Sequence, residues 1–206
     1  MKVLLINGSP HTSGCTYTAL SEVASTLNAH GIETEILHVG VRPVISCQAC
    51  GLCKKEHRCI HNDIVNLIIE KAEEADGFIF GSPVHYAAAS GAMTTVMDRV
   101  LYAGSPAFAY KPAAVVVSAR RGGCSATYDQ LNKYIGISRM IAVPSQYWNM
   151  VHGATAEDVA RDEEGLQTMR TIGRNMAWLL RLLENGKKSG IPMPDDEPVI
   201  RTNFIR

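Results

Sequence analysis

Residues 3–16 read VLLINGSPHTSGCT, an apolar run that opens into a loop of small polar residues. Val3–Ile6 form the continuous apolar run typical of a strand covered on both faces, and Gly8 and Pro10 end it. Short hydroxyls then lie beside the backbone N–H groups that begin the next helix, supplied by Ser9, Thr12, Ser13 and Thr16. This order of strand, loop and helix predicts a binding site for an anion.

The loop lacks the residues of the common nucleotide-binding motifs. No Lys follows in the GxxxxGK[ST] order, so nothing reaches towards a γ-phosphate, and no GxGxxG turn is present to hold a pyrophosphate. A single phosphate monoester is therefore the better match. The alternative is that the Ser, Thr and Gly residues only connect the strand to the helix and cap it.

Length and charge exclude several classes of protein. The 206 residues are enough for one domain with a full core and too few for two. Twenty Lys and Arg balance twenty Asp and Glu, so neither a nucleic-acid face nor an acidic-tail partner is indicated. Neither a signal-like segment nor an apolar run of bilayer length is apparent, so we expect a cytoplasmic protein with no membrane partner. In that setting six Cys favour reduced thiols or metal ligands over disulfides.

Apolar stretches alternate with amphipathic ones along most of the chain. After the first strand, we expect strands at 32–39, 77–82, 112–118 and 140–144, and helices at 17–29, from 63, and at 90–101, 125–134 and 157–184. Five strands alternating with helices predict an α/β fold with a doubly wound parallel sheet. We expect one domain over 1–186 with a cysteine-rich insert at 43–62, and an extended tail over 187–206 that is disordered or lies along a neighbouring subunit.

Ligands of such sheets bind beyond the carboxyl ends of the strands, where the strand order switches direction. Three polar loops leave strands at that edge, at Ser9–Thr16, Pro83–Tyr86 and Ser118–Gly123. The aromatic segment 145–153 follows the fifth strand and is expected to be irregular. For its residues Tyr147, Trp148 and Met150 three positions are open: over a ligand, at a subunit contact, or packed under a long loop.

The sequences of the three loops, GSPHTSGCT, GSPVHY and SARRGG, resemble those of the flavodoxin-like NADPH-dependent FMN reductase family in order and spacing, and the resemblance covers residues 1–184. It implies a three-layer sandwich with a five-stranded parallel sheet in the order 2-1-3-4-5. It also implies FMN as cofactor, NAD(P)H as electron donor, and a homodimer or homotetramer.

The same resemblance implies the residues that hold FMN. The phosphate lies on the first loop, at Ser9, His11, Ser13, Gly14, Cys15 and Thr16. The isoalloxazine edge lies on the second loop, at Pro83, Val84, His85 and Tyr86. The third loop borders the other side of the ring, at Ser118, Arg120, Gly122 and Gly123.

This sequence departs from the family pattern at two positions of the first loop. His11 stands where the family often has Arg, and Cys15 where it often has Asn, so we expect weaker or pH-dependent phosphate binding. Each residue also has a structural alternative: His11 as an exposed loop residue, Cys15 as a small buried filler, and His85 with Tyr86 as helix-entry residues. Arg120 and Arg121 either attract the 2′-phosphate of NADPH or belong to a solvated loop.

The insert carries the spacing Cys47-x2-Cys50-x2-Cys53-x5-Cys59, four thiols within thirteen residues. Three Cys at two-residue gaps are typical of [4Fe–4S] ligation. A zinc site with His57 or His61 among its ligands is the main competitor, and disulfide or free-thiol chemistry of the Cys50–Cys53 pair is the third reading. The position of the insert after the second strand resembles the iron-sulfur flavoprotein branch of the family, which implies a capacity to bind a cluster at these four residues.

No catalytic acid or base is expected, because a flavin itself accepts the hydride and releases electrons singly or in pairs. The prediction is an FMN-dependent oxidoreductase that takes electrons from NAD(P)H and passes them to a flavin, a quinone or a one-electron acceptor, the last through a cluster where one is bound. Two alternatives stay open. One is an FMN-binding electron carrier or redox sensor without substrate turnover, and the other is a zinc-stabilised binding module without flavin.

Overall fold

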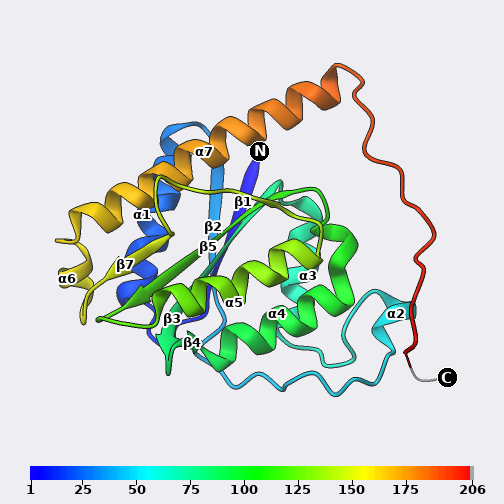
Figure 1. The fold of residues 1–206 in the computed structure, drawn as a ribbon, viewed down its shortest axis with the longest axis horizontal. Helices are drawn as coiled ribbons and strands as arrows, with labels where there is room; N and C mark the ends of the chain where they lie inside the picture. The colour runs from blue at the N-terminus through cyan, green and yellow to red at the C-terminus, as the bar shows by residue number, and fades with distance from the viewer. Residues whose placement is uncertain (205–206) are drawn as a thin grey trace.

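The structure is a computed structural model that describes residues 1–204. Its centre is a parallel sheet with the strand order β2-β1-β3-β5-β6, so the predicted order is confirmed. These strands are β1 (Lys2–Asn7), β2 (Glu33–His38), β3 (Gly77–His85), β5 (Pro112–Ala119) and β6 (Ile141–Ala142). Helices cover both faces of the sheet, which gives the predicted three layers (Figure 1).

The side chains of β1 alternate between two separate cores. Val3 and Leu5 pack in the core formed with α1 (Cys15–Ala29) and α7 (Glu163–Lys188). Leu4 and Ile6 pack on the other face, in the core formed with α3 (Ile64–Glu74), α4 (Gly91–Gly104) and α5 (Cys124–Ile137). All four side chains are at most 1% exposed. The apolar run therefore fixes β1 in the middle of the sandwich, as expected for a strand buried on both faces.

The fifth strand differs from the prediction because it is split. β6 pairs with the start of β5, at Pro112 and Ala113. A second piece, β7 (Met150–His152), pairs with the end of β5, so the segment 145–153 is not wholly irregular. Both pieces pair with one edge of β5, and the residues between them leave that edge and return to it.

The predicted helix 157–184 is also divided. It consists of the short α6 (Ala156–Val159) and the long α7, which runs past Gly186 and ends at Lys188. Two N-caps explain the break. The Thr155 hydroxyl accepts the Asp158 N–H, and the Asp162 carboxylate accepts the Gly165 N–H at the start of α7.

The second polar loop is a hairpin and not an open turn. β3 continues to His85 and pairs antiparallel with the short β4 (Ala88–Ala89). The two residues between the strands, Tyr86 and Ala87, have φ values of 52° and 58°. Two left-handed residues in succession are typical of a type I′ hairpin turn. The remaining short elements are α2 (Cys53–Glu56) and the 3₁₀ turn η1 (Ser105–Ala107).

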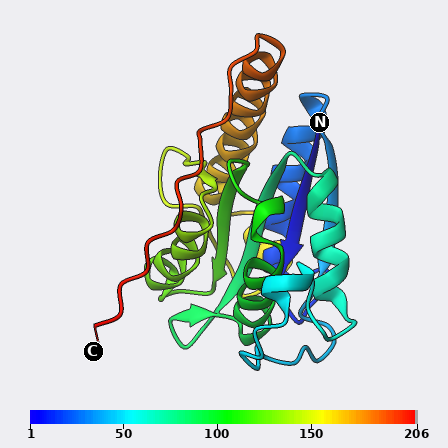
Figure 2. The same ribbon diagram turned by 90° about the vertical axis from the view of Figure 1, so that its right-hand side faces the viewer.

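After α7 the chain has neither helix nor strand over 191–204. This tail runs back along the outside of the domain (Figures 1 and 2). Asp196 attaches it, because its carboxylate pairs with Arg139 and accepts a hydrogen bond from the Tyr110 hydroxyl. None of the helices within 1–204 combines the length and the apolar composition needed to cross a membrane.

Gly40 shows how closely the chain after β2 approaches the loop that leaves β1. A Cβ at Gly40 would lie 2.3 Å from the backbone oxygen of Ser9 and 2.8 Å from that of Gly8. We predict that Gly40→Ala lowers the free energy of unfolding by about 1–3 kcal/mol, because one backbone segment must move away from the other. Urea unfolding measures the loss.

Gly91→Ala is the matched control, since a Cβ at Gly91 meets nothing within 4 Å. Gly91 is the first residue of α4, where Ala is expected to leave stability unchanged or to raise it by up to about 1 kcal/mol. Equal stabilities for the two variants would show that the approach of Gly40 to Ser9 is not a constraint.

Candidate functional site

The first polar loop is folded by its own short side chains. Ser9 is buried, its N–H donates to the side-chain oxygen of Asn7 at 3.0 Å, and its hydroxyl accepts the His11 N–H at 3.1 Å. Gly14 is the N-cap of α1, and no side chain caps this 15-residue helix or places an acid in its first turn. The N–H groups at the start of α1 therefore present a partial positive charge, and the N-terminus fits a phosphate group.

The second loop is tied to the first through two buried serines. The Ser90 hydroxyl donates to the Gly8 carbonyl at 2.7 Å, and the Ser90 N–H donates to the Ser82 hydroxyl at 2.9 Å. The Gly8 N–H in turn donates to the Gly81 carbonyl at 2.8 Å. The sequence did not lead us to expect Ser82 and Ser90 at the site. The signal was present, because both are small polar residues at strand or helix ends of the predicted ligand edge.

The first and third loops meet at a pair of buried hydroxyls. The Thr16 and Ser118 hydroxyl oxygens are 2.8 Å apart and hydrogen-bonded, and these residues are 1% and 2% exposed. Thr16 lies in the first turn of α1 and Ser118 near the end of β5. This bond holds the start of α1 against the end of β5.

The second and third loops touch at Gly123, which has a φ of 91°. A Cβ at this position would lie 2.8 Å from a Val84 methyl group and 2.9 Å from the Cα of Ala87. Glycine is therefore required twice over, by its left-handed backbone and by the close approach of the hairpin. The third loop thus contacts both of the others, and the first and second loops are joined through the residues that flank them, Gly8, Gly81, Ser82 and Ser90.

The residues expected to hold a ligand divide by burial into a base and a rim. The buried base consists of Ser9, Thr16 and Ser118. Partly buried residues surround it: Gly14, Cys15, Pro83, Val84 and Gly123. The exposed rim contains His11, Ser13, His85, Tyr86, Arg120 and Gly122. A small polar floor with a wider exposed rim suits a ligand with a compact anionic end and a larger body.

Burial disfavours the thiolate form of two cysteines, Cys15 in the first loop and Cys124 directly after the third loop. Burial raises the pKa of Cys15, whose Sγ contacts the Gly153 carbonyl oxygen at 3.5 Å. Burial also raises the pKa of Cys124, whose Sγ lies 3.7 Å from Nε2 of His152. Since the thiolate is the reactive form, neither residue is suited to covalent chemistry at neutral pH.

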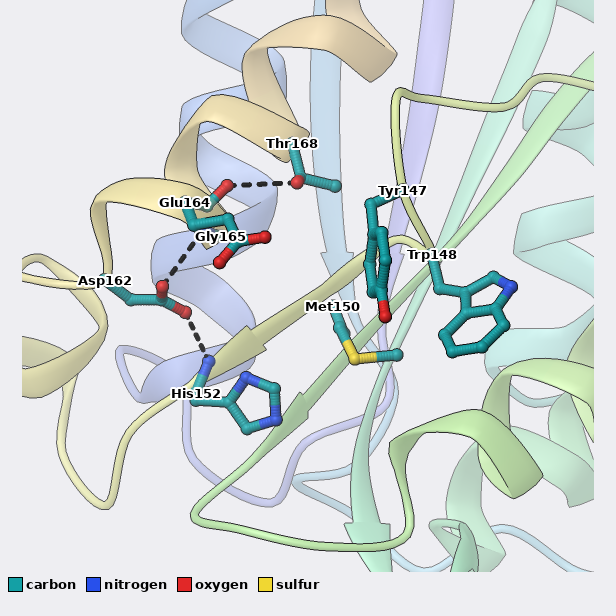
Figure 3. Close-up of a pocket in the computed structure, with 8 residues that line it drawn as sticks. All are labelled: Tyr147, Trp148, Met150, His152, Asp162, Glu164, Gly165 and Thr168. Carbon is teal, nitrogen blue, oxygen red and sulfur yellow. Dashed lines mark hydrogen bonds between the residues drawn. The ribbon is translucent and has the colours of Figure 1, made fainter.

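A cavity of about 180 Å³ lies beside β7, next to the end of β5 (Figure 3). Its walls are Tyr147, Trp148, Met150, His152, Asp162, Glu164, Gly165 and Thr168. Tyr147 and Trp148 are 56% and 51% exposed, which excludes the alternative that they are packed under a loop. The Asp162 carboxylate is engaged within the wall, because it accepts N–H groups from His152 and Gly165.

The cysteine-rich insert lies outside the three-loop site. Cys47 and Cys50 are exposed, whereas Cys53 and Cys59 are partly buried. Burial, and then the charges of the other three cysteines, raise the pKa of Cys53. Within residues 1–204 no three His, Cys, Asp or Glu side chains are arranged to coordinate a metal ion. The four thiols fit an iron-sulfur cluster or zinc by the chemistry of the donors and by their spacing in the sequence.

Arg99 of α4 is the buried charge beside this insert, and the sequence analysis missed it. Its Nε and Nη2 groups donate to the Cys59 sulfur at 3.3 and 3.1 Å, and it also pairs with Asp63. The available signal was its place on the apolar stripe of α4, between the buried Val96 and Val100. A charged residue on a buried helix face requires a partner.

Comparison with known proteins agrees with this architecture. Residues 1–155 match the family described as NADPH-dependent FMN reductase. An iron-sulfur flavoprotein of Methanocaldococcus jannaschii is 33% identical over 192 residues, which are 89% of this chain and 100% of that protein.

Two solved structures are similar in fold. RosB with a bound intermediate, 8-demethyl-8-formylriboflavin-5′-phosphate, has a TM-score of 0.70 at 15% identity, covering 100% of this chain and 92% of RosB. A flavodoxin from the domain Archaea has a TM-score of 0.62 at 15% identity, covering 88% and 99% of the two chains. These likenesses confirm the predicted flavodoxin-like fold.

The Thr16–Ser118 bond yields a prediction that requires no ligand. We expect Thr16→Val or Ser118→Ala alone to lower the free energy of unfolding by about 1–3 kcal/mol, because each leaves a buried hydroxyl without its partner. The double variant should lose less than the sum of the single losses, since both hydroxyls are then gone. Urea unfolding of the four proteins gives the coupling energy, and strict additivity would contradict the contact.

Proposed function

The chain belongs to the NADPH-dependent FMN reductase family, and from this premise we propose that it binds FMN at the three-loop site. In this proposal it takes electrons from NAD(P)H and passes them to a flavin, a quinone or a one-electron acceptor. The observation that carries the proposal is the convergence of the three loops, directly or through their flanking residues, beside the uncapped N-terminus of α1.

We assign the FMN phosphate to the first loop. The N–H groups at the start of α1 favour an anion, and the floor beneath them carries the hydroxyls of Ser9 and Thr16. His11 is exposed on the rim, where a protonated imidazole would add a positive charge beside the phosphate. Ser13, Gly14 and Cys15 complete the turn into the helix.

We assign the isoalloxazine ring to the edge at which the second and third loops meet. Pro83, Val84, His85 and Tyr86 border one side, and Ser118, Arg120, Gly122 and Gly123 border the other. Gly123 sets the separation of these loops, because it admits the hairpin at van der Waals distance. The exposed Arg120 and Arg121 supply the positive charge that would attract the 2′-phosphate of NADPH.

FMN, when bound, accepts a hydride and releases electrons singly or in pairs. The chain's contribution is therefore to orient the ring, to leave one face open to NAD(P)H, and to place backbone N–H groups near the ring edge. No side chain is required as a general acid or base, and we assign none.

The cysteine insert extends the proposal to one-electron chemistry. We propose that Cys47, Cys50, Cys53 and Cys59 hold a [4Fe–4S] cluster, which the name of the iron-sulfur flavoprotein relative supports. Zinc at the same four thiols is the competing occupant. The homodimer or homotetramer implied by the resemblance stays a prediction.

The first experiment is an absorbance spectrum of protein purified without air, followed by NAD(P)H oxidation with FMN, a quinone or ferricyanide as acceptor. Bound flavin and turnover above the rate of free FMN support the reductase. Bound flavin without turnover would favour an electron carrier or redox sensor. A colourless protein that takes up no FMN would reject the site.

Ser9→Glu tests the phosphate assignment. We predict at least tenfold weaker FMN binding, because a carboxylate near the phosphate adds a repulsion well above the ~1.4 kcal/mol that corresponds to a factor of ten. Fluorescence titration of the flavin-free protein measures the dissociation constant. Asn185→Glu adds the same charge at an exposed position of α7 and should bind FMN as the wild type does.

Cys50→Ser tests whether the cysteine insert carries the one-electron activity while the flavin site carries quinone reduction. We expect loss of most iron and of the one-electron rate with ferricyanide, whereas FMN content and quinone reduction persist, because Cys50 lies outside the three-loop site. Iron analysis and the two steady-state assays measure these properties. Ser46→Ala, an exposed change in the same segment, should leave all of them unchanged. Parallel loss of flavin and quinone activity would contradict the assignment.

A further inference from the structure

Arg99 lies 2% exposed on α4, and its guanidinium is fully hydrogen-bonded. Nε and Nη2 donate to the Cys59 sulfur, Nη1 and Nη2 donate to the two carboxylate oxygens of Asp63 at 2.7 and 3.0 Å, and Nη1 also donates to the Ile45 carbonyl at 3.0 Å. These are five contacts for the five N–H donors of an arginine. The side chain is thus fixed in one orientation.

The Asp63 carboxylate balances the charge of Arg99, but two N–H donors of Arg99 are directed to the Cys59 sulfur. A guanidinium remains positive in proteins, and Asp63 supplies one negative charge through a two-point contact. The other two-point contact ends on sulfur, which is a weak acceptor as a neutral thiol. Two donors from a buried cation suit a sulfur that carries negative charge, as a cysteine does when it ligates a metal.

Cys59 is also held through its backbone. The Asn66 side chain on α3 accepts the Cys59 N–H and donates to the Cys59 carbonyl, both at 2.9 Å. Asn66 is itself buried. By contrast, Cys47 and Cys50 lie on an exposed stretch without helix or strand. Of the four cysteines, Cys59 is therefore the one fixed from both its backbone and its side chain.

We propose that Arg99 is a positioning residue for the four-cysteine site. Arg99 holds the Cys59 sulfur in a fixed position, so that Cys59 is the preplaced ligand and the exposed cysteines of the insert bind the metal around it. Arg99 also raises the reduction potential of an iron-sulfur cluster bound there. Hydrogen bonds and positive charge at a ligand sulfur stabilise the more negative, reduced state, and such outer partners also orient the ligand. This inference rests on the proposed metal site of the insert.

The test compares Arg99→Met and Arg99→Lys with the wild type, and uses Arg139→Met as a control that removes a surface arginine from its pair with Asp196. The iron-free chains are titrated with Co²⁺, whose thiolate absorption reports binding. The chains reconstituted with iron and sulfide without air are titrated electrochemically. Circular dichroism and FMN retention confirm that each variant is folded.

We expect Arg99→Met to bind Co²⁺ about 10–100-fold more weakly, the usual effect of losing an outer partner of a metal ligand. Its reconstituted cluster should be reduced at a more negative potential than that of the wild type. Arg99→Lys keeps the positive charge but loses the two-point contact with sulfur. Its Co²⁺ affinity and its reduction potential should therefore lie between those of Arg99→Met and the wild type. Arg139→Met should match the wild type in both measurements.

The role of Arg99 would be overturned if the wild type binds Co²⁺ and the iron-sulfur cluster and both Arg99 variants have the same Co²⁺ affinity and reduction potential as the wild type. That result would leave the metal site itself in place. A purely structural arginine would alter stability without moving the potential of the protein that remains folded. If Arg99→Met does not fold, Arg99→Lys decides the question by the same two measurements. A wild type that takes up neither Co²⁺ nor a cluster would overturn the metal site itself, and the inference with it.

Discussion

The burial of β1 on both faces and its pairing on both edges fix the rest of the molecule. The ladder continues at each side as the strand ends, because the Val39 N–H donates to the Asn7 carbonyl and the Gly8 N–H donates to the Gly81 carbonyl. The buried Asn7 side chain then binds both the Ser9 N–H and the His38 ring. Hydrogen bonds on both sides therefore fix the position at which the first polar loop begins. Parallel pairing brings the ends of β3 and β5 to the same edge of the sheet.

α4 connects this edge to the cysteine insert. Its N-cap, Ser90, binds the Gly8 carbonyl of the first loop, and nine residues later Arg99 binds Cys59. At about 1.5 Å per residue, this is roughly 13 Å of helix. A buried ion pair adds little net stability compared with an apolar pair of the same size, whereas leaving either charge unpaired is costly. Arg99 is therefore better explained by the position of Cys59 than by the stability of the domain, whereas Asp63 also caps α3.

Most of the fold followed from local patterns in the sequence. The alternation of strands and helices, the helix start at Asp63 and the three polar loops depend on apolar periodicity, caps and the geometry of parallel crossovers, all of which act over short stretches. The strand order was implied by the family resemblance and not by these local patterns. The split fifth strand, Ser90 and Arg99 were missed for a different reason. Each depends on a partner far along the chain, such as Gly8 for Ser90 and Cys59 for Arg99, and no local pattern specifies such a partner.

At the tip of the β3–β4 hairpin, the backbone conformation differs from the one that the residues there prefer. Tyr86 and Ala87 both adopt left-handed backbone that glycine or asparagine would adopt with less strain, and Tyr86 is fully exposed. Neither hydrophobic burial nor turn propensity accounts for a tyrosine there. The contact of Gly123 with Ala87 holds the turn in place from below, so the strain is supported by the third loop. Strained and exposed residues held by their surroundings are typical of ligand-binding edges, which is the role that the three-loop site gives to Tyr86.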